Sequence, residues 1–168
     1  MNIKKVLGSS FLGGCAVSSV VSCSSATAAY ENNFEAEIFQ EFVQGGKPLE
    51  IIKKSVYSFV DALSDLFKEG GFNDSSKNNF VLSLGRFVEG VVFLNKTGCC
   101  SASEIDEFGY EGSEYCKKAL PDWFLKLEDQ YAVPPEILVE RVPEEYREAF
   151  KFFIKEMEGV KEKYKPQF

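Results

Sequence analysis

Apolar residues recur at helical spacing along most of this chain. The clearest run follows Lys47-Pro48 and ends at Gly70-Gly71, with apolar residues on one face and polar or charged residues on the other. A single domain must bury such a face, so the run predicts a core helix rather than a partner-binding groove. Its apolar residues are Ile52, Val56, Phe59, Val60, Leu63, Leu66 and Phe67.

A second long helix is predicted from about Lys77 to Asn95, after Asp74-Ser75-Ser76, whose side chains can cap its start. Its apolar residues cover more than half of its circumference, which indicates a central helix packed antiparallel to the first. Gly85 and Gly90 weaken a helix, so they imply that a neighbouring helix or ring approaches closely there. The run from Val91 to Leu94 could instead form a short strand. The apolar residues are Phe80, Val81, Leu84, Phe87, Val88, Val91, Val92 and Leu94.

Shorter helices are expected on both sides of this hairpin. One runs from Asn32-Asn33 to the break at Gly45-Gly46. Beyond the hairpin, helix starts are expected at Gly112, Pro135 and Pro143, and Pro121 either kinks the helix that begins at Gly112 or begins the next one. The pattern therefore predicts an all-α protein with a single domain over residues 30–168, a small helical bundle of about five to six helices. The apolar side of the first short helix consists of Phe34, Ile38, Phe39 and Phe42.

The first 29 residues have the composition of a secretory signal peptide, with Lys4 and Lys5 before an apolar stretch and then small residues. The leader could be cleaved at either of two positions. The run Val20-Val21-Ser22-Cys23 resembles a bacterial lipobox and makes Cys23 the candidate for lipidation. The small residues at Ala28 and Ala29 instead fit an ordinary signal peptidase site.

The two possible cleavage positions predict different locations for the mature protein. Lipidation at Cys23 would place the protein in the periplasm or at the outer membrane, and Ser24 fits outer-membrane sorting. Ordinary cleavage would make it secreted or periplasmic. Cys15 ends a second lipobox-like run, but the apolar stretch before it is short. Serines and glycines dilute the whole stretch, which disfavours a retained helix that spans the membrane.

Charge and composition narrow the classes of function. The net charge of −7 becomes −9 without the two lysines of the first 29 residues, and so acidic a surface repels nucleic acid and anionic lipid. Membrane contact is therefore expected only through an N-terminal lipid. The chain has no histidine, which removes Ser-His-Asp and Cys-His catalysis and imidazole metal sites.

The stretch from Gly98 to Cys116 joins the two helical halves and gathers cysteines and acids. In an oxidising compartment, Cys116 could pair with Cys99 or Cys100 and pin this connector, stabilising the fold by about 3 kcal/mol. The adjacent Cys99 and Cys100 could also bond to each other, with strain. Three cysteines leave one odd thiol, which stays free, is buried or links two molecules into a dimer.

The acids of the same stretch predict an exposed interaction loop. A calcium loop that starts at Glu104 is disfavoured, because Phe108 and Tyr115 stand where it needs oxygen ligands. A zinc site is disfavoured too, since the thiols lack C-x-x-C spacing. Hydrolysis by two acids, such as Glu104 and Glu107, would need them about 5 to 9 Å apart across a cleft. No metal or cofactor is expected. The loop residues are Glu104, Asp106, Glu107 and Glu111.

These observations favour an exported cell-envelope protein that acts as a non-catalytic interaction module for a protein partner. One alternative is a small secreted enzyme or effector that uses carboxylates. Another is a helical carrier of an apolar ligand, in which the 16 phenylalanines line a cavity instead of filling a core.

Overall fold

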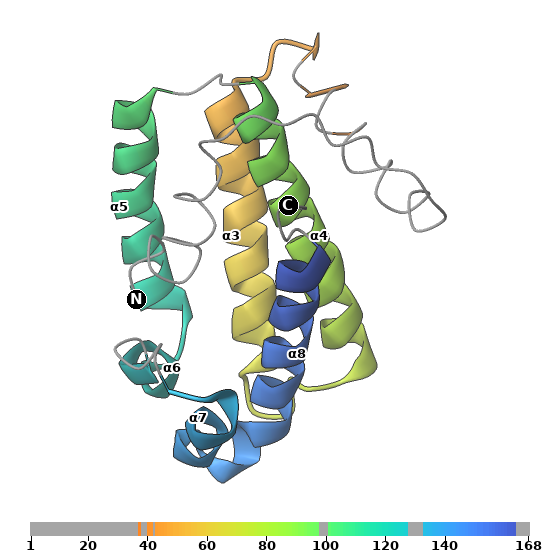
Figure 1. The fold of residues 1–168 in the computed structure, drawn as a ribbon, viewed down its shortest axis with the longest axis vertical. Coiled ribbons are helices and arrows are strands. Elements are labelled where there is room, and N and C mark those ends of the chain that lie inside the picture. Colours follow the sequence, from red (N-terminus) through yellow and green to blue (C-terminus); the bar gives the residue numbers. More distant parts are fainter. Residues whose placement is uncertain (1–36, 38–39, 42, 98–100, 128–132, 164–168) are drawn as a thin grey trace.

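The computed structural model describes residues 37, 40–41, 43–97, 101–127 and 133–163. This part of the chain contains helices and no strand, so the predicted all-α fold is confirmed (Figure 1). None of its helices is both long and apolar enough to cross a membrane. The elements are α3 (Pro48–Leu66), α4 (Asp74–Thr97), α5 (Ala102–Ala119), α6 (Asp122–Lys126), α7 (Pro135–Arg141), the 3-10 helix η2 (Glu144–Tyr146) and α8 (Arg147–Lys163).

Helix α3 is the centre of the bundle. Figure 1 shows it with α5 on one side and with α4 and α8 on the other. Pro48 occupies the first turn, where a proline costs no helical hydrogen bond, and Gly70 turns the chain after the helix with φ of 68°. Every residue of the predicted apolar face is buried, which confirms the core helix.

Helix α4 packs along α3 and forms the predicted hairpin with it. Its start differs from the prediction because Asn73 caps it, so that the helix begins at Asp74 rather than at Lys77. The N–H of Ser76 donates to Oδ1 of Asn73 at 3.0 Å, and the N–H of Asn73 donates to Oγ of Ser76 at 3.1 Å. This reciprocal pair satisfies two backbone donors at the helix start.

The second half of α4 is helical up to Thr97, so the alternative of a short strand from Val91 to Leu94 is wrong. Gly90 is buried against α3, where an added Cβ would lie 3.5 Å from Cγ1 of Ile52. The close approach predicted from this glycine is therefore present.

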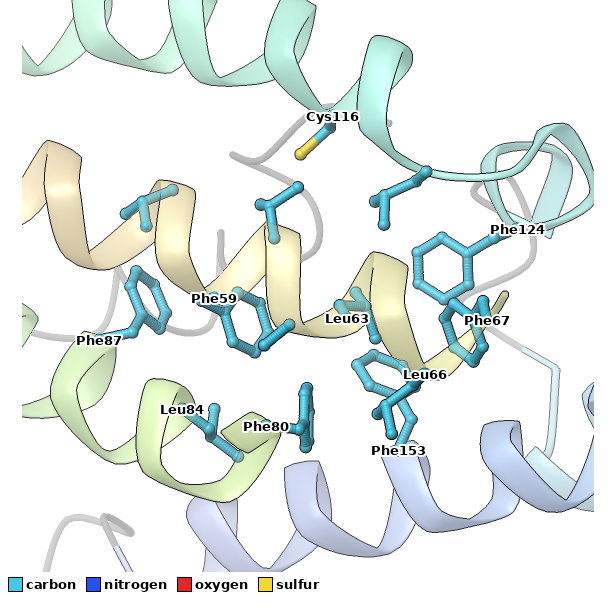
Figure 2. Packing of buried hydrophobic residues seen from close by; sticks show 14 of the residues in the cluster. Phe59, Leu63, Leu66, Phe67, Phe80, Leu84, Phe87, Cys116, Phe124 and Phe153 are labelled. Carbon is cyan, nitrogen blue, oxygen red and sulfur yellow. The ribbon is translucent and has the colours of Figure 1, made fainter. Parts of the chain in front are cut away.

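Aromatic rings from four helices fill the interior (Figure 2). Phe59 of α3 stacks on Phe87 of α4, with 5.4 Å between ring centroids. Phe80 of α4 lies 5.5 Å from Phe59 and 6.1 Å from Phe153 of α8. Phe124 of α6 lies 5.5 Å from Phe153. Each ring removes a large apolar area from water, so these contacts join α6 and α8 to the α3–α4 hairpin.

Prolines begin the short segments of the second half, as predicted. Pro121 precedes α6, Pro135 lies in the first turn of α7, and Pro143 precedes η2. Arg147 then connects α7 to α8, because its Nε donates to the carbonyl oxygen of Val142 at 3.0 Å. Val142 is itself buried in the core.

The prediction for the N-terminal region is tested only in part. Residues 37, 40, 41 and 43 are helical, and Gly45 follows with φ of 92°. Glu37 forms an ion pair with Arg86 of α4. The apolar residues Phe34, Ile38, Phe39 and Phe42 lie outside the described residues, as does the leader with Cys23.

Substitution of Phe80 tests the aromatic core. Phe80 is fully buried, so Phe80→Ala is expected to lower the free energy of unfolding by about 3 to 5 kcal/mol. Val81, the next residue, was expected on the buried face but is 41% exposed, so Val81→Ala should change stability by about 0.5 kcal/mol or less. Urea unfolding followed by circular dichroism measures both. Equal losses in the two variants would contradict this core.

Candidate functional site

The connector between the two halves is a helix rather than the predicted loop. Helix α5 begins right after Ser101, well before the start expected at Gly112. The hydroxyl of Ser101 accepts from the N–H of Glu104 at 3.2 Å, and the N–H of Ser101 donates to the Glu104 carboxylate at 2.8 Å. This is a capping box, whose Ser-x-x-Glu signature is visible in the sequence and marks the helix start.

The cysteines do not form the predicted staple. Cys116 is fully buried and points from α5 toward the side chains of α3 (Figure 2). Along the axis of α5, Cys116 lies about 22 Å from Ser101. Cys99 is two residues before Ser101 in the sequence, so its Cα can lie at most about 7 Å from that of Ser101. A disulfide needs Cα atoms within about 7 Å. Pairing of Cys116 with Cys99 or Cys100 in one chain is thus incompatible with this helix, and Cys116, the one cysteine among the described residues, forms no disulfide.

Cys99 and Cys100 themselves lie outside the described residues. A bond between these two neighbours, or a dimer through one of them, therefore stays a prediction. One of the predicted roles of the odd thiol was burial as a small apolar side chain. Cys116 fits that role, because it belongs to the buried core cluster.

The predicted interaction residues are all exposed along α5. Glu104 belongs to the capping box, and the N–H and hydroxyl of Ser101 hold the pKa of its carboxyl below the usual value. Glu111 forms an ion pair with Lys53 of α3 at 2.9 Å. Asp106 and Glu107 are exposed. Among the described residues, no three acids or cysteines are grouped so that they could hold a metal ion.

Polar side chains line the contact between α3 and α5, which we call the α3–α5 seam: Lys53, Tyr57, Asp61, Ser64, Glu111 and Tyr115. The hydroxyl of Tyr115 donates to Oδ1 of Asp61 at 2.5 Å. The ring of Tyr115 also lies 4.5 Å from the ring of Tyr57, measured between centroids. At the C-terminal end of α5, the hydroxyl of Ser64 donates to the carbonyl oxygen of Ala119 at 2.7 Å.

The seam shifts the pKa of its ionisable groups. The hydrogen bond with Glu111 raises the pKa of Lys53, and burial raises the pKa of Tyr57. The hydrogen bond to the Asp61 carboxylate raises the pKa of Tyr115 to about 12. Lysine and tyrosine are protonated at neutral pH even at their ordinary pKa values, and these shifts strengthen that preference.

The outer side of α5 carries an exposed aromatic residue among acids. Tyr110 is 71% exposed, and helical spacing puts it beside Asp106, Glu107 and Glu114. We call these four residues the acidic face of α5. Glu114 pairs with Lys117 within the helix at 2.7 Å, while Asp106 and Glu107 are exposed. Tyr110 was not among the interaction residues predicted from the sequence, because the connector was expected to be a loop. Residues three or four positions apart share a face in a helix but not in a loop.

Comparison of the chain with protein-family models, with curated proteins and with solved structures finds no match. Its function has to be inferred from its own residues.

The Tyr115–Asp61 hydrogen bond predicts a specific pH dependence. Tyr115 should ionise at pH about 12, and Asp61→Asn should bring its pKa down toward 10. The folded state holds this proton more tightly, so the stabilisation by the bond is complete below pH 10 and is lost as the pH rises to about 12. Ultraviolet titration of tyrosinate, with Tyr115→Phe to assign the late phase, measures this. An unchanged late phase in Asp61→Asn would contradict it.

Proposed function

We propose that this protein is exported to the cell envelope and binds another protein through the acidic face of α5. The observation that carries the proposal is the exposure of Tyr110 at the centre of this face. Water contact over most of an aromatic ring is unfavourable, and tyrosine is enriched among the residues that dominate binding energy at protein interfaces. A partner that covers this ring would gain both apolar area and a hydroxyl contact.

The acids around Tyr110 indicate the chemistry of the partner. Asp106, Glu107 and Glu114 form a negative patch on a protein whose net charge is already −7. Such a patch attracts a basic surface from a distance and disfavours acidic partners, which sets the rate and specificity of association. The partner is thus expected to present lysines or arginines around an apolar contact for the ring.

The N-terminal leader supports the proposed export to the cell envelope. Lys4 and Lys5, the apolar stretch and Cys23 in its lipobox-like setting would direct the chain out of the cytoplasm and attach lipid to Cys23. The acidic domain would be repelled by anionic headgroups. This repulsion would keep the domain away from the membrane surface and leave the acidic face of α5 accessible.

The two alternatives have less support. A carboxylate enzyme would need two acids facing each other across a cleft, whereas Glu104 is engaged at the start of α5 and Glu111 contacts Lys53. A carrier would need a cavity lined by phenylalanines, whereas Phe59, Phe80 and Phe153 contact other rings in the core.

Intact mass of the protein isolated from producing cells tests the export part. A chain that begins at Cys23 with attached acyl groups is the expected result, and Cys23→Ala should abolish the added mass. A chain that begins near Ala28 or Ala29 would keep export and remove lipidation. The mass of all 168 residues with the leader intact would contradict export.

Site-specific photo-crosslinking in the producing cells tests the binding part. A benzophenone amino acid at position 110 is expected to give a discrete adduct with one protein, while the same group at exposed Leu82 of α4 should not. With the captured partner purified, Tyr110→Ala should weaken binding about 30-fold, and Asp106→Asn with Glu107→Gln should slow association at low salt.

Equal adducts from positions 110 and 82, or none from either, would contradict the binding site. Leu82→Ala is the matched control for Tyr110→Ala, because Leu82 is an exposed apolar residue on a different helix. Its binding constant should stay that of the unaltered protein.

A further inference from the structure

Few of the described side chains of helix α5 belong to the common core. Of its 18 residues, Cys116 alone belongs to the buried core cluster among the side chains that the structure describes, while α3 supplies seven of them. Phe108, Tyr115 and Ala119 are only partly buried at its edge. Buried apolar area is the main source of cohesion between helices, so α5 is bound less firmly to α3 than α4 is.

Polar contacts add to the small apolar contact between α5 and α3. Two of them join side chains on opposite helices, the Lys53–Glu111 ion pair at 2.9 Å and the Tyr115–Asp61 hydrogen bond at 2.5 Å. The carboxylate side chain of Glu111 is 43% exposed. Water can replace both partners of such contacts when the helices separate, so each contact is lost at a small cost.

The backbone leaves the helical conformation at both ends of α5. Ser101 at its start has an extended backbone with ψ of 158°, and Leu120 at its end has ψ of 148°. Pro121 follows and starts α6 separately. In Figure 1, α5 lies on the side of α3 away from α4 and α8, and the rings of Phe59, Phe80 and Phe153 pack on one another without a residue of α5.

We infer that α5 opens from α3 as a unit while the rest of the bundle stays folded, and that Lys53–Glu111 and Tyr115–Asp61 form the clasp that closes it. Opening uncovers the thiol of Cys116, which is fully buried in the closed state. It also uncovers the side of α3 that carries Tyr57 and, one turn along, Val60. The protein then has a second, less polar surface that only the open state presents. This inference does not depend on whether the acidic face binds a partner.

Two measurements on the full chain follow the opening. Amide hydrogen exchange reports on the helical hydrogen bonds, and alkylation by N-ethylmaleimide, read at the Cys116 peptide by mass spectrometry, reports on the exposed thiol. The amides of α5 and the thiol of Cys116 should react at least about tenfold faster than global unfolding of α3 and α4 allows. Their rates should also depend less on urea, because separation of one helix exposes less surface than unfolding.

Matched variants test the clasp. Glu111→Gln with Tyr115→Phe removes both contacts to α3 and should speed the reaction of Cys116 by about tenfold more. Glu114→Gln with Tyr110→Phe makes the same chemical changes on the same helix, but Glu114 pairs within α5 and Tyr110 is exposed. This control should leave the rate within about twofold of the unaltered protein.

Two results would overturn the inference. One is protection of α5 and Cys116 equal to that of α4, with the same urea dependence, since α5 would then open only by global unfolding. The other is the same rate in the clasp variant and in its control. Loss of the photo-crosslinked partner at position 110 would bear on the proposed function alone and would leave these rates unchanged.

Discussion

The burial of helix α3 determines where the other helices lie. Its buried apolar residues form one broad face, and a single neighbouring helix would leave part of that face in water. Helices α4 and α8 cover one side through rings such as Phe80 and Phe153, and α5 covers the other. The bundle is thus arranged around one helix that needs cover on two sides.

The two sides of α3 are covered in chemically different ways. Toward α4 and α8 the contact is apolar and aromatic, and the buried ring of Phe59 contacts both Phe80 and Phe87. Toward α5 it is the α3–α5 seam, where Lys53 and Asp61 provide charged partners. Apolar contacts carry most of the stability of a bundle, whereas exposed polar contacts mainly fix how two helices align. The same difference makes α5 both the presenting surface for a partner and the element that can separate.

The helix α5 also shows how one misplaced boundary alters a functional interpretation. With its start placed at Gly112, the acids before it formed a loop, and Cys116 stood close enough to Cys99 and Cys100 for a disulfide. With its start at the Ser101–Glu104 capping box, the same residues lie on a helix, so they are spaced along its axis and point to different sides of it. Tyr110 then joins Asp106 and Glu107 on one face, and Cys116 turns inward to the core.

The sequence by itself determined the all-α fold, the α3–α4 hairpin and the proline-led starts of the second half, because periodicity, caps and proline act within a few residues. The capping box of α5 was available from the sequence in the same way. Only the tertiary structure decided the partners of Glu111 and Tyr115. Tyr115 and Asp61 are 54 positions apart, so the pair exists only once α5 lies along α3. Short-range rules place a side chain on a helix, but the packing of that helix on another decides what the side chain contacts.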